Sequence, residues 1–182
     1  LHSFPTRRSS DLLVRFRAAG GDVSTVHSVA SFFVSRVDTE TDRRLDALDA
    51  PAELRGRLGI ANAKLAYGRY RAMFSPENPL WAELAAAGAQ PQRCLWASTS
   101  TKNPDYRDVL YVEELIGPET VDTMPAATVR AFQDHGTVAP THEQGHVEAQ
   151  QLLARLADVG IDYDNVVRTL ETEGIEKFTA AF

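Results

Sequence analysis

The chain has 182 residues, of which 43% are hydrophobic and 24% are charged, a composition typical of one globular domain with a sizeable core. Its formal net charge of -6 argues against a broad surface for nucleic acid or for an anionic membrane. Cys94 is the single cysteine, so the chain forms no internal disulfide, and no apolar run approaches the roughly 18 residues that span a bilayer. We therefore expect a cytoplasmic protein.

The first twelve residues, LHSFPTRRSSDL, differ in character from the rest of the chain. They contain Arg and Ser, as a targeting peptide does, but they lack an apolar core and a small-residue cleavage site. Back-translated codon by codon, they correspond to a widely used short-read sequencing adapter. We interpret residues 1–12 as a non-native, adapter-derived peptide and residues 13–182 as the native part.

Three apolar segments, each bounded by Gly or Pro, are predicted to be strands. They are Val26–Ser35, Arg93–Thr99 and Glu119–Met124. Short apolar runs between turn residues are typical of strands that are covered on both faces.

Helices are predicted between these strands and after the last one. The predicted ranges are Asp38–Leu48 with Asp38 or Thr39 as N-cap, Ala52–Phe74, Ala126–Asp134 after Pro125, Glu143–Val159 and Asp164–Glu173. Strands that alternate with helices predict an α/β fold with a parallel sheet of βαβ units. A parallel sheet of three strands has two open edges, so we expect that part of the domain is missing.

The sequence HEQGH, from His142 to His146, matches the zinc motif H-E-x-x-H, in which Glu143 would activate water. This pattern makes a zinc hydrolase one alternative function. Thr141 and Gln144 form a capping-box pattern, which places the motif in the first turn of a helix rather than in its interior. We therefore favour a structural role for the motif and expect no metal.

Several other conspicuous residues are interpreted as structural. Cys94 lies inside an apolar strand, where a free cysteine behaves as a small hydrophobic residue. Trp81, Trp96 and the pair Phe32-Phe33 are predicted to lie in the core, and the charged stretch 39–49 is predicted to be a solvated helix face.

Polar and basic side chains follow two of the predicted strands. Ser35 and Arg36 end the first, and the stretch Ser98–Asn103, which includes Lys102, ends the second. In parallel α/β barrels, functional groups gather at the carboxyl ends of the strands. A cation together with hydroxyls and backbone N–H groups suits a phosphate dianion, so the sequence indicates a phosphate-binding site here.

The same residues carry a family resemblance. The stretches SVASFFVSRVDTETDRRLD and LWASTSTKNPDYRDVLYVEELIGPETVDTMPAATVRAFQDHG resemble transaldolases of the bacterial type, from about Ala18 to the chain end. The resemblance implies that residues 13–182 are the C-terminal part of a TIM (β/α)8 barrel, containing strands 6–8 and the helices that follow. It also implies transfer of a dihydroxyacetone unit in the pentose phosphate pathway through a lysine Schiff base, with no metal or organic cofactor.

The resemblance assigns four substrate-binding residues. Arg36 corresponds to the phosphate-binding arginine, Ser31 to a substrate-site serine on the same strand and Ser98 to a serine near the phosphate. Lys102 is a second cation for the phosphate, two residues further along than the Arg-Asn of other branches. The implied partners are sedoheptulose 7-phosphate, fructose 6-phosphate, glyceraldehyde 3-phosphate and erythrose 4-phosphate.

The catalytic lysine of the family belongs to a motif such as K-[IV]-P-[AG]-T, which this chain lacks. Its lysines are Lys64, Lys102 and Lys177, and none has that context. We therefore predict no catalytic residue in this chain and no activity of the chain alone. A non-catalytic α/β module that binds sugar phosphates is the second alternative function.

Overall fold

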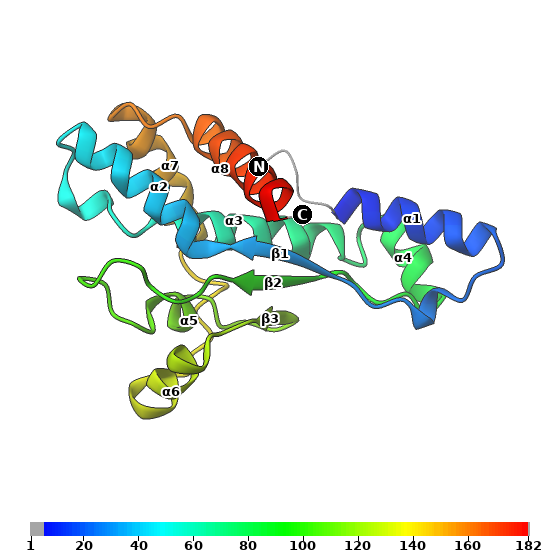
Figure 1. Ribbon diagram of the computed structural model, residues 1–182. Coiled ribbons are helices and arrows are strands. Elements are labelled where there is room, and N and C mark those ends of the chain that lie inside the picture. Colours follow the sequence, from blue (N-terminus) through cyan, green and yellow to red (C-terminus); the bar gives the residue numbers. More distant parts are fainter. Residues whose placement is uncertain (1–5, 182) are drawn as a thin grey trace.

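A computed structural model describes residues 6–181 as an α/β fold built on a parallel sheet of three strands in the order β1-β2-β3 (Figure 1). The strands are β1 (Val29–Phe33), β2 (Arg93–Ala97) and β3 (Thr120–Asp122). Residue Ala30 pairs with Cys94, which in turn pairs with Thr120. The predicted parallel α/β architecture is confirmed.

The helices alternate with the strands and also flank the sheet. The α-helices are α1 (Thr6–Ala18), α2 (Val34–Ala47), α3 (Leu58–Met73), α4 (Pro79–Ala86), α5 (Leu110–Glu114), α6 (Ala126–His135), α7 (His146–Asp158) and α8 (Tyr163–Ala181). Two 3-10 turns are η1 (Val23–Thr25) and η2 (Ala52–Leu54). The sequence analysis did not predict α1, α4 or α5. Of the residues assigned to the adapter peptide, 1–5 lie outside the described residues and 6–12 belong to α1.

The first two strands end earlier than predicted. Helix α2 begins directly after β1, so Ser35 lies in the first turn of a helix and not in a strand. Strand β2 ends at Ala97 because Ser98 has a φ of 58°, which is incompatible with extended backbone. Both Ser35 and Ser98 therefore lie directly after the last residues of their strands, at the carboxyl edge of the sheet.

Several predicted helix boundaries were also wrong. Asp38 caps no helix, because α2 starts four residues before it and Phe33 occupies the N-cap position. The predicted helix 52–74 is divided into η2 and α3 because Gly56, with a φ of 66°, turns the chain between them.

Helix α3 lies along one face of the sheet and packs against α2 and α7 (Figure 1). Its apolar side chains join two hydrophobic clusters, one shared with α2, α7 and α8 and one shared with the strands and α5. A third cluster joins α1 to α4 at the amino ends of the strands. Cys94, Trp81 and Trp96 are buried as predicted.

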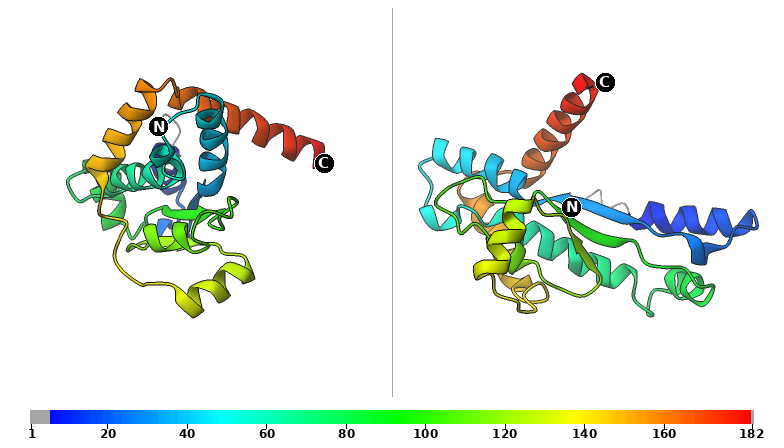
Figure 2. Two further views of the ribbon diagram at one scale, coloured as in Figure 1. Left: turned by 90° about the vertical axis from the view of Figure 1, so that its left-hand side faces the viewer. Right: turned by 60° about the horizontal axis from the view of Figure 1, so that its bottom comes forward.

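The opposite face of β1 is open. Ala30 is buried, but the neighbouring side chains of Val29, Ser31 and Phe33 are exposed. The expectations that both faces of this strand are covered and that Phe33 lies in the core were therefore wrong. The last turns of α8 project away from the rest of the molecule (Figure 2). Within residues 6–181, no helix is both long and apolar enough to cross a membrane.

Candidate functional site

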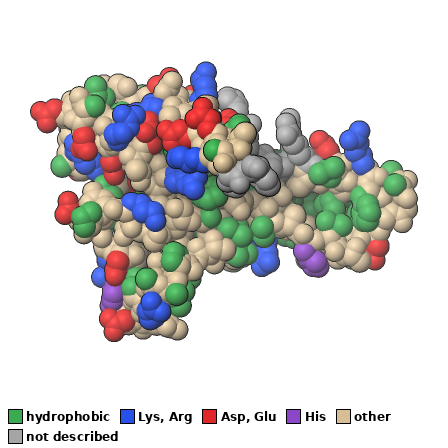
Figure 3. Space-filling view, in the orientation of Figure 1, with side chains coloured by type: hydrophobic (Ala, Val, Ile, Leu, Met, Phe, Trp, Pro, Cys, Tyr) green, Lys and Arg blue, Asp and Glu red, His purple; other side chains and the backbone are tan. Residues whose placement is uncertain are grey.

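A pocket of about 590 Å³ lies at the carboxyl edge of the sheet. Its lining comes from the first turns of α2, from the segment after β2 and from α8. The lining residues are Ser35, Arg36, Thr39, Glu40, Arg43, Ser98, Lys102, Leu170, Glu173, Gly174 and Lys177. Side chains of both charges gather over α2 and α8 in the space-filling view (Figure 3).

Arg36 lies in the first turn of α2. Its guanidinium carbon is 4.6 Å from the centre of the Phe33 ring, a cation–π contact that orients the side chain without neutralising it. Among the described side chains, no carboxylate forms an ion pair with Arg36. Its charge and its five N–H donors therefore remain available to an anion in the pocket.

The N-terminus of α2 lies at the same place. Phe33, at the N-cap position, provides no side-chain hydrogen bond to the first turn, and the backbone N–H of Ser35 donates to the carbonyl of Ser98 at 3.1 Å. The partial positive charge at this helix end favours an anion next to Arg36.

Ser98 is held in an unusual conformation at the end of β2. Its φ of 58° lies in the left-handed region, which non-glycine residues seldom adopt. Its hydroxyl shares a hydrogen bond of 2.7 Å with the hydroxyl of Ser35, which is 1% exposed. The contact joins the segment after β2 to α2 and fixes two hydroxyls at the pocket wall.

Lys102 and two cations that the sequence analysis missed complete the basic lining. Lys102 donates to Ser100 Oγ at 2.8 Å, so its ammonium is held by a neutral partner. Arg43 and Lys177 form ion pairs with Glu40 and Glu173. Arg36, Glu40 and Arg43 follow helical spacing, a signal that could have placed Arg43 on the side of α2 that bears Arg36.

Ser31 lies in an adjoining pocket of about 580 Å³. This second pocket shares Arg36, Leu170 and Gly174 with the first and also contains Phe33 and other apolar side chains of α2 and α8. The structure thus brings together Arg36, Ser98 and Lys102 and places Ser31 next to them, on the far side of Arg36.

The remaining lysine lies outside both pockets. Lys64, in α3, is 9% exposed and donates to Glu114 Oε2 at 2.8 Å. Burial raises the pKa of the Cys94 thiol to about 12, so this cysteine is an inert core residue at neutral pH.

The H-E-x-x-H motif does not lie on one helix. Helix α7 begins at His146, and Gly145, with a φ of 78°, turns the chain before it. His142 is 2% exposed and packs between Tyr67 and Trp96, whereas His146 is exposed. Burial lowers the pKa of His142 to about 3, so the ring is neutral.

The predicted capping box is also absent, which is a correction. Thr141 Oγ1 donates to the carbonyl of Glu113, and the side chain of Gln144 donates to the carbonyl of Pro140. The two histidines therefore do not form the paired ligands that the zinc hydrolase alternative requires. Across the described side chains, no group of three or more His, Cys, Asp or Glu is suited to a metal ion.

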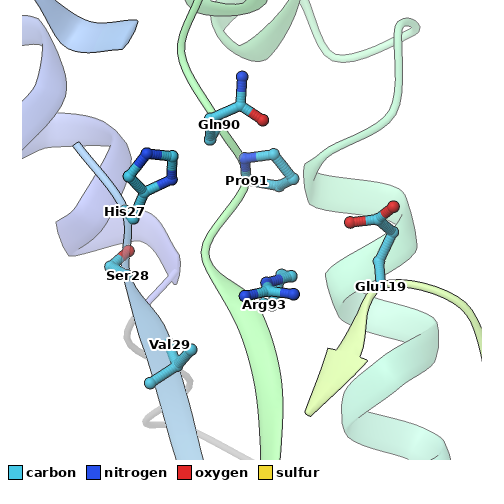
Figure 4. Close-up of a pocket in the computed structure, with 7 residues that line it drawn as sticks. All are labelled: His27, Ser28, Val29, Gln90, Pro91, Arg93 and Glu119. Carbon is cyan, nitrogen blue, oxygen red and sulfur yellow. The ribbon is translucent and has the colours of Figure 1, made fainter. Parts of the chain in front are cut away.

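A smaller pocket of about 330 Å³ lies at the amino edge of the sheet (Figure 4). Its lining residues are His27, Ser28, Val29, Gln90, Pro91, Arg93 and Glu119. In Figure 4, the side chains of Arg93 and Glu119 come from β2 and from the turn before β3. Among the residues that line this pocket, Arg93 is the one arginine and none belongs to a helix.

The fold and the larger pocket define a parallel α/β protein with a basic pocket at the carboxyl edge of its sheet. Residues 13–182 match the family described as Transaldolase/Fructose-6-phosphate aldolase. The chain belongs to this family, in agreement with the resemblance of its strand-end motifs.

Curated bacterial relatives give the same result. The chain is 55% identical to a transaldolase of Frankia alni over 163 residues, which are 88% of this chain and 43% of that protein. It is 53% identical to a transaldolase of Renibacterium salmoninarum over 169 residues and 50% identical to one of Thermobifida fusca over 173 residues. These matches cover 91% and 93% of the chain but 45% and 46% of the relatives. The chain therefore spans less than half the length of these relatives.

Proposed function

We propose that residues 13–182 form the C-terminal portion of a transaldolase barrel and provide the phosphate-binding side of its active site. In this arrangement β1, β2 and β3 are the sixth, seventh and eighth strands of a (β/α)8 barrel, and residues 1–12 are not part of it. The exposed face of β1, with Val29 and Phe33 each 42% exposed, supports this arrangement, because an inward face of a barrel strand packs against strands that this chain does not supply.

The observation that carries the proposal is the convergence of Arg36, Lys102 and the N-terminus of α2 on one pocket. Arg36 binds two oxygens of a sugar phosphate through its guanidinium fork, and Lys102 supplies a point charge. The first-turn N–H groups of α2 other than that of Ser35, which donates to the carbonyl of Ser98, and the hydroxyl of Ser98 complete the donors. Ser31, beyond Arg36, contacts the sugar.

In the whole protein, this site binds sedoheptulose 7-phosphate and fructose 6-phosphate as ketose donors, and glyceraldehyde 3-phosphate and erythrose 4-phosphate as acceptors. A dihydroxyacetone unit passes from a ketose to an aldose through a Schiff base with a lysine. The cytoplasm is the proposed location, which suits the free thiol of Cys94.

The chain alone forms no Schiff base in this proposal. Lys64 forms an ion pair with Glu114 and lies outside the pockets. Lys102 and Lys177 are exposed side chains at the pocket rim. Borohydride treatment with fructose 6-phosphate should leave the mass of the chain unchanged. A stable adduct on any of the three lysines would contradict this assignment.

A further inference from the structure

Two aspartates on successive turns of α2 hold two other segments in the same way. Asp38 accepts hydrogen bonds from the backbone N–H of Gly59 at 2.6 Å and from the hydroxyl of Tyr111 at 2.8 Å. Asp42, one turn later, accepts from the N–H of Gly56 at 2.9 Å and from the hydroxyl of Tyr106 at 2.6 Å. Asp38 therefore joins α2 to the first turn of α3 and to α5, whereas Asp42 joins α2 to the turn before α3 and to the segment between β2 and α5.

The two bridges differ in their surroundings. Asp38 and Tyr111 are each 1% exposed, so the inner bridge belongs to the core. Tyr106 is half-buried, and its ring packs on Gly56, where an added Cβ would lie 2.7 Å from Tyr106 Cζ. The outer bridge lies next to the functional pocket.

A short turn connects the outer bridge to Lys102. The backbone N–H of Asp105 donates to Asn103 Oδ1 at 3.0 Å, and the N–H of Tyr106 donates to the Asn103 carbonyl at 3.2 Å. These bonds make residues 103–106 one compact turn, and Lys102 directly precedes it, so a bond that anchors Tyr106 limits where Lys102 can lie.

There is space into which this unit could move if it were released. A hollow of about 270 Å³ lies between the turn and α2, and its lining includes Asp42, Lys102 and Tyr106. The hollow adjoins the functional pocket, with which it shares Thr39, Arg43 and Lys102. On the side of the hollow, no described side chain packs tightly enough to prevent the turn from moving towards α2 once the Tyr106 bond is removed.

We propose that Tyr106 is a positioning residue, whose hydrogen bond to Asp42 holds the turn 102–106 against α2 so that Lys102 faces the phosphate pocket. This inference rests on the proposed function of that pocket. Tyr106 touches no substrate and acts only through Lys102, which distinguishes it from the residues that line the pocket.

The first test is titration of inorganic phosphate into the 182-residue chain by calorimetry. Tyr106→Phe keeps the ring on Gly56 and removes the hydroxyl, and it should weaken phosphate binding about fivefold to tenfold. The matched control is Tyr67→Phe, which removes a hydroxyl that donates to the carbonyl of Pro118 at 3.0 Å, away from the pocket. The control should stay within about twofold of the unmodified chain.

Combination with Lys102→Ala separates positioning from a general effect. If Tyr106 acts through Lys102, the change Tyr106→Phe should alter affinity by less than about twofold in the Lys102→Ala background. If Tyr106→Phe weakened phosphate binding by the same factor with and without Lys102→Ala, the inference would be overturned. Equal affinities for Tyr106→Phe and the unmodified chain would also overturn it.

A second measurement separates this inference from the proposed function. Hydrogen exchange of the Asp105 and Tyr106 amides, without phosphate, should be faster in Tyr106→Phe and unchanged in Tyr67→Phe. Absence of phosphate binding by the unmodified chain would contradict the proposed function, while the exchange result would still decide the role of Tyr106. Unchanged exchange in Tyr106→Phe would reject the anchoring role.

Discussion

The two edges of the sheet both contain pockets with an arginine and a glutamate, yet they differ in how their donors are arranged. At the carboxyl edge, Arg36 shares a pocket with Lys102 and the N-terminus of α2. At the amino edge, Arg93 and Glu119 share a smaller pocket with no helix N-terminus (Figure 4). We therefore expect the anion at the carboxyl edge, because several donors directed at one place bind an anion better than a hollow with a single cation does.

The largest expected difference between the edges is in the free energy of unfolding, because the buried hydrogen bonds of Asp38 lie beneath the carboxyl edge. Asp38→Ala leaves the Tyr111 hydroxyl and the Gly59 N–H without their acceptor, so we expect a loss of about 3 kcal/mol in the free energy of unfolding. Glu119→Ala, at the exposed amino edge, should change it by less than about 0.5 kcal/mol. Urea denaturation measures both, and equal losses would remove the distinction.

The two arginines provide the next test. Arg36→Ala should weaken inorganic phosphate binding about thirtyfold, because it removes a charge-assisted pair of donors. Arg93→Ala should leave the affinity unchanged. Calorimetric titration compares the two variants directly, and a similar loss in both would show that the bound phosphate is not specific to the carboxyl edge.

The carboxyl edge should also respond to pH through Asp38. Burial raises the pKa of this carboxyl from 3.8 to about 7, so between these values the folded chain holds a proton that the unfolded chain has released. The stability from Asp38 is therefore complete below about pH 4 and is lost as the pH rises towards 7. Relative to Asp38→Asn, the unmodified chain should lose stability between pH 5 and 7.5, measured by urea denaturation.

His142 provides the control of opposite sign. Burial lowers its pKa from 6.5 to about 3, so the unfolded chain takes up a proton first and the His142 contribution is lost as the pH falls below 6.5. Relative to His142→Phe, the unmodified chain should lose stability on acidification. If both comparisons, with Asp38→Asn and with His142→Phe, gave a stability difference that changes in the same direction with pH, the assignment of a protonated Asp38 and a neutral His142 would be contradicted.

The smallest expected effect concerns backbone strain, which both edges contain. Glu119 has a φ of 56° and Ser98 a φ of 58°. Glu119→Gly should stabilise the chain by about 1 kcal/mol in thermal or urea denaturation, because glycine adopts this conformation freely. Ser98→Gly should stabilise the chain less than Glu119→Gly does, since it also removes the hydrogen bond to Ser35. A larger gain from Ser98→Gly would mean that this bond contributes little.

The sequence predicted the sheet and part of the basic pocket for a simple physical reason. Short apolar runs bounded by Gly and Pro formed parallel strands, and the carboxyl ends of parallel strands meet at one edge. Arg36, Ser98 and Lys102 therefore line one pocket. Ser31 does not line it, because it lies within β1 on the open face of that strand.

The features that the sequence did not reveal depend on residues far apart in the chain. Asp38 resembles an N-cap in sequence, but its acceptor role is set by Gly59 and Tyr111, which lie 21 and 73 residues away. Lys177 reaches the pocket only because α8 packs against α2. Local patterns contain no information about either contact.

The intrinsic fluorescence of the two tryptophans can report on two different parts of the fold. Trp81 belongs to the cluster that joins α1 to α4, and Trp96 belongs to the cluster of the sheet, α3 and α5. Replacing one tryptophan by Phe leaves the fluorescence of the other as a reporter of its own cluster. Emission recorded during unfolding would then show whether the α1–α4 end melts together with the sheet or separately from it.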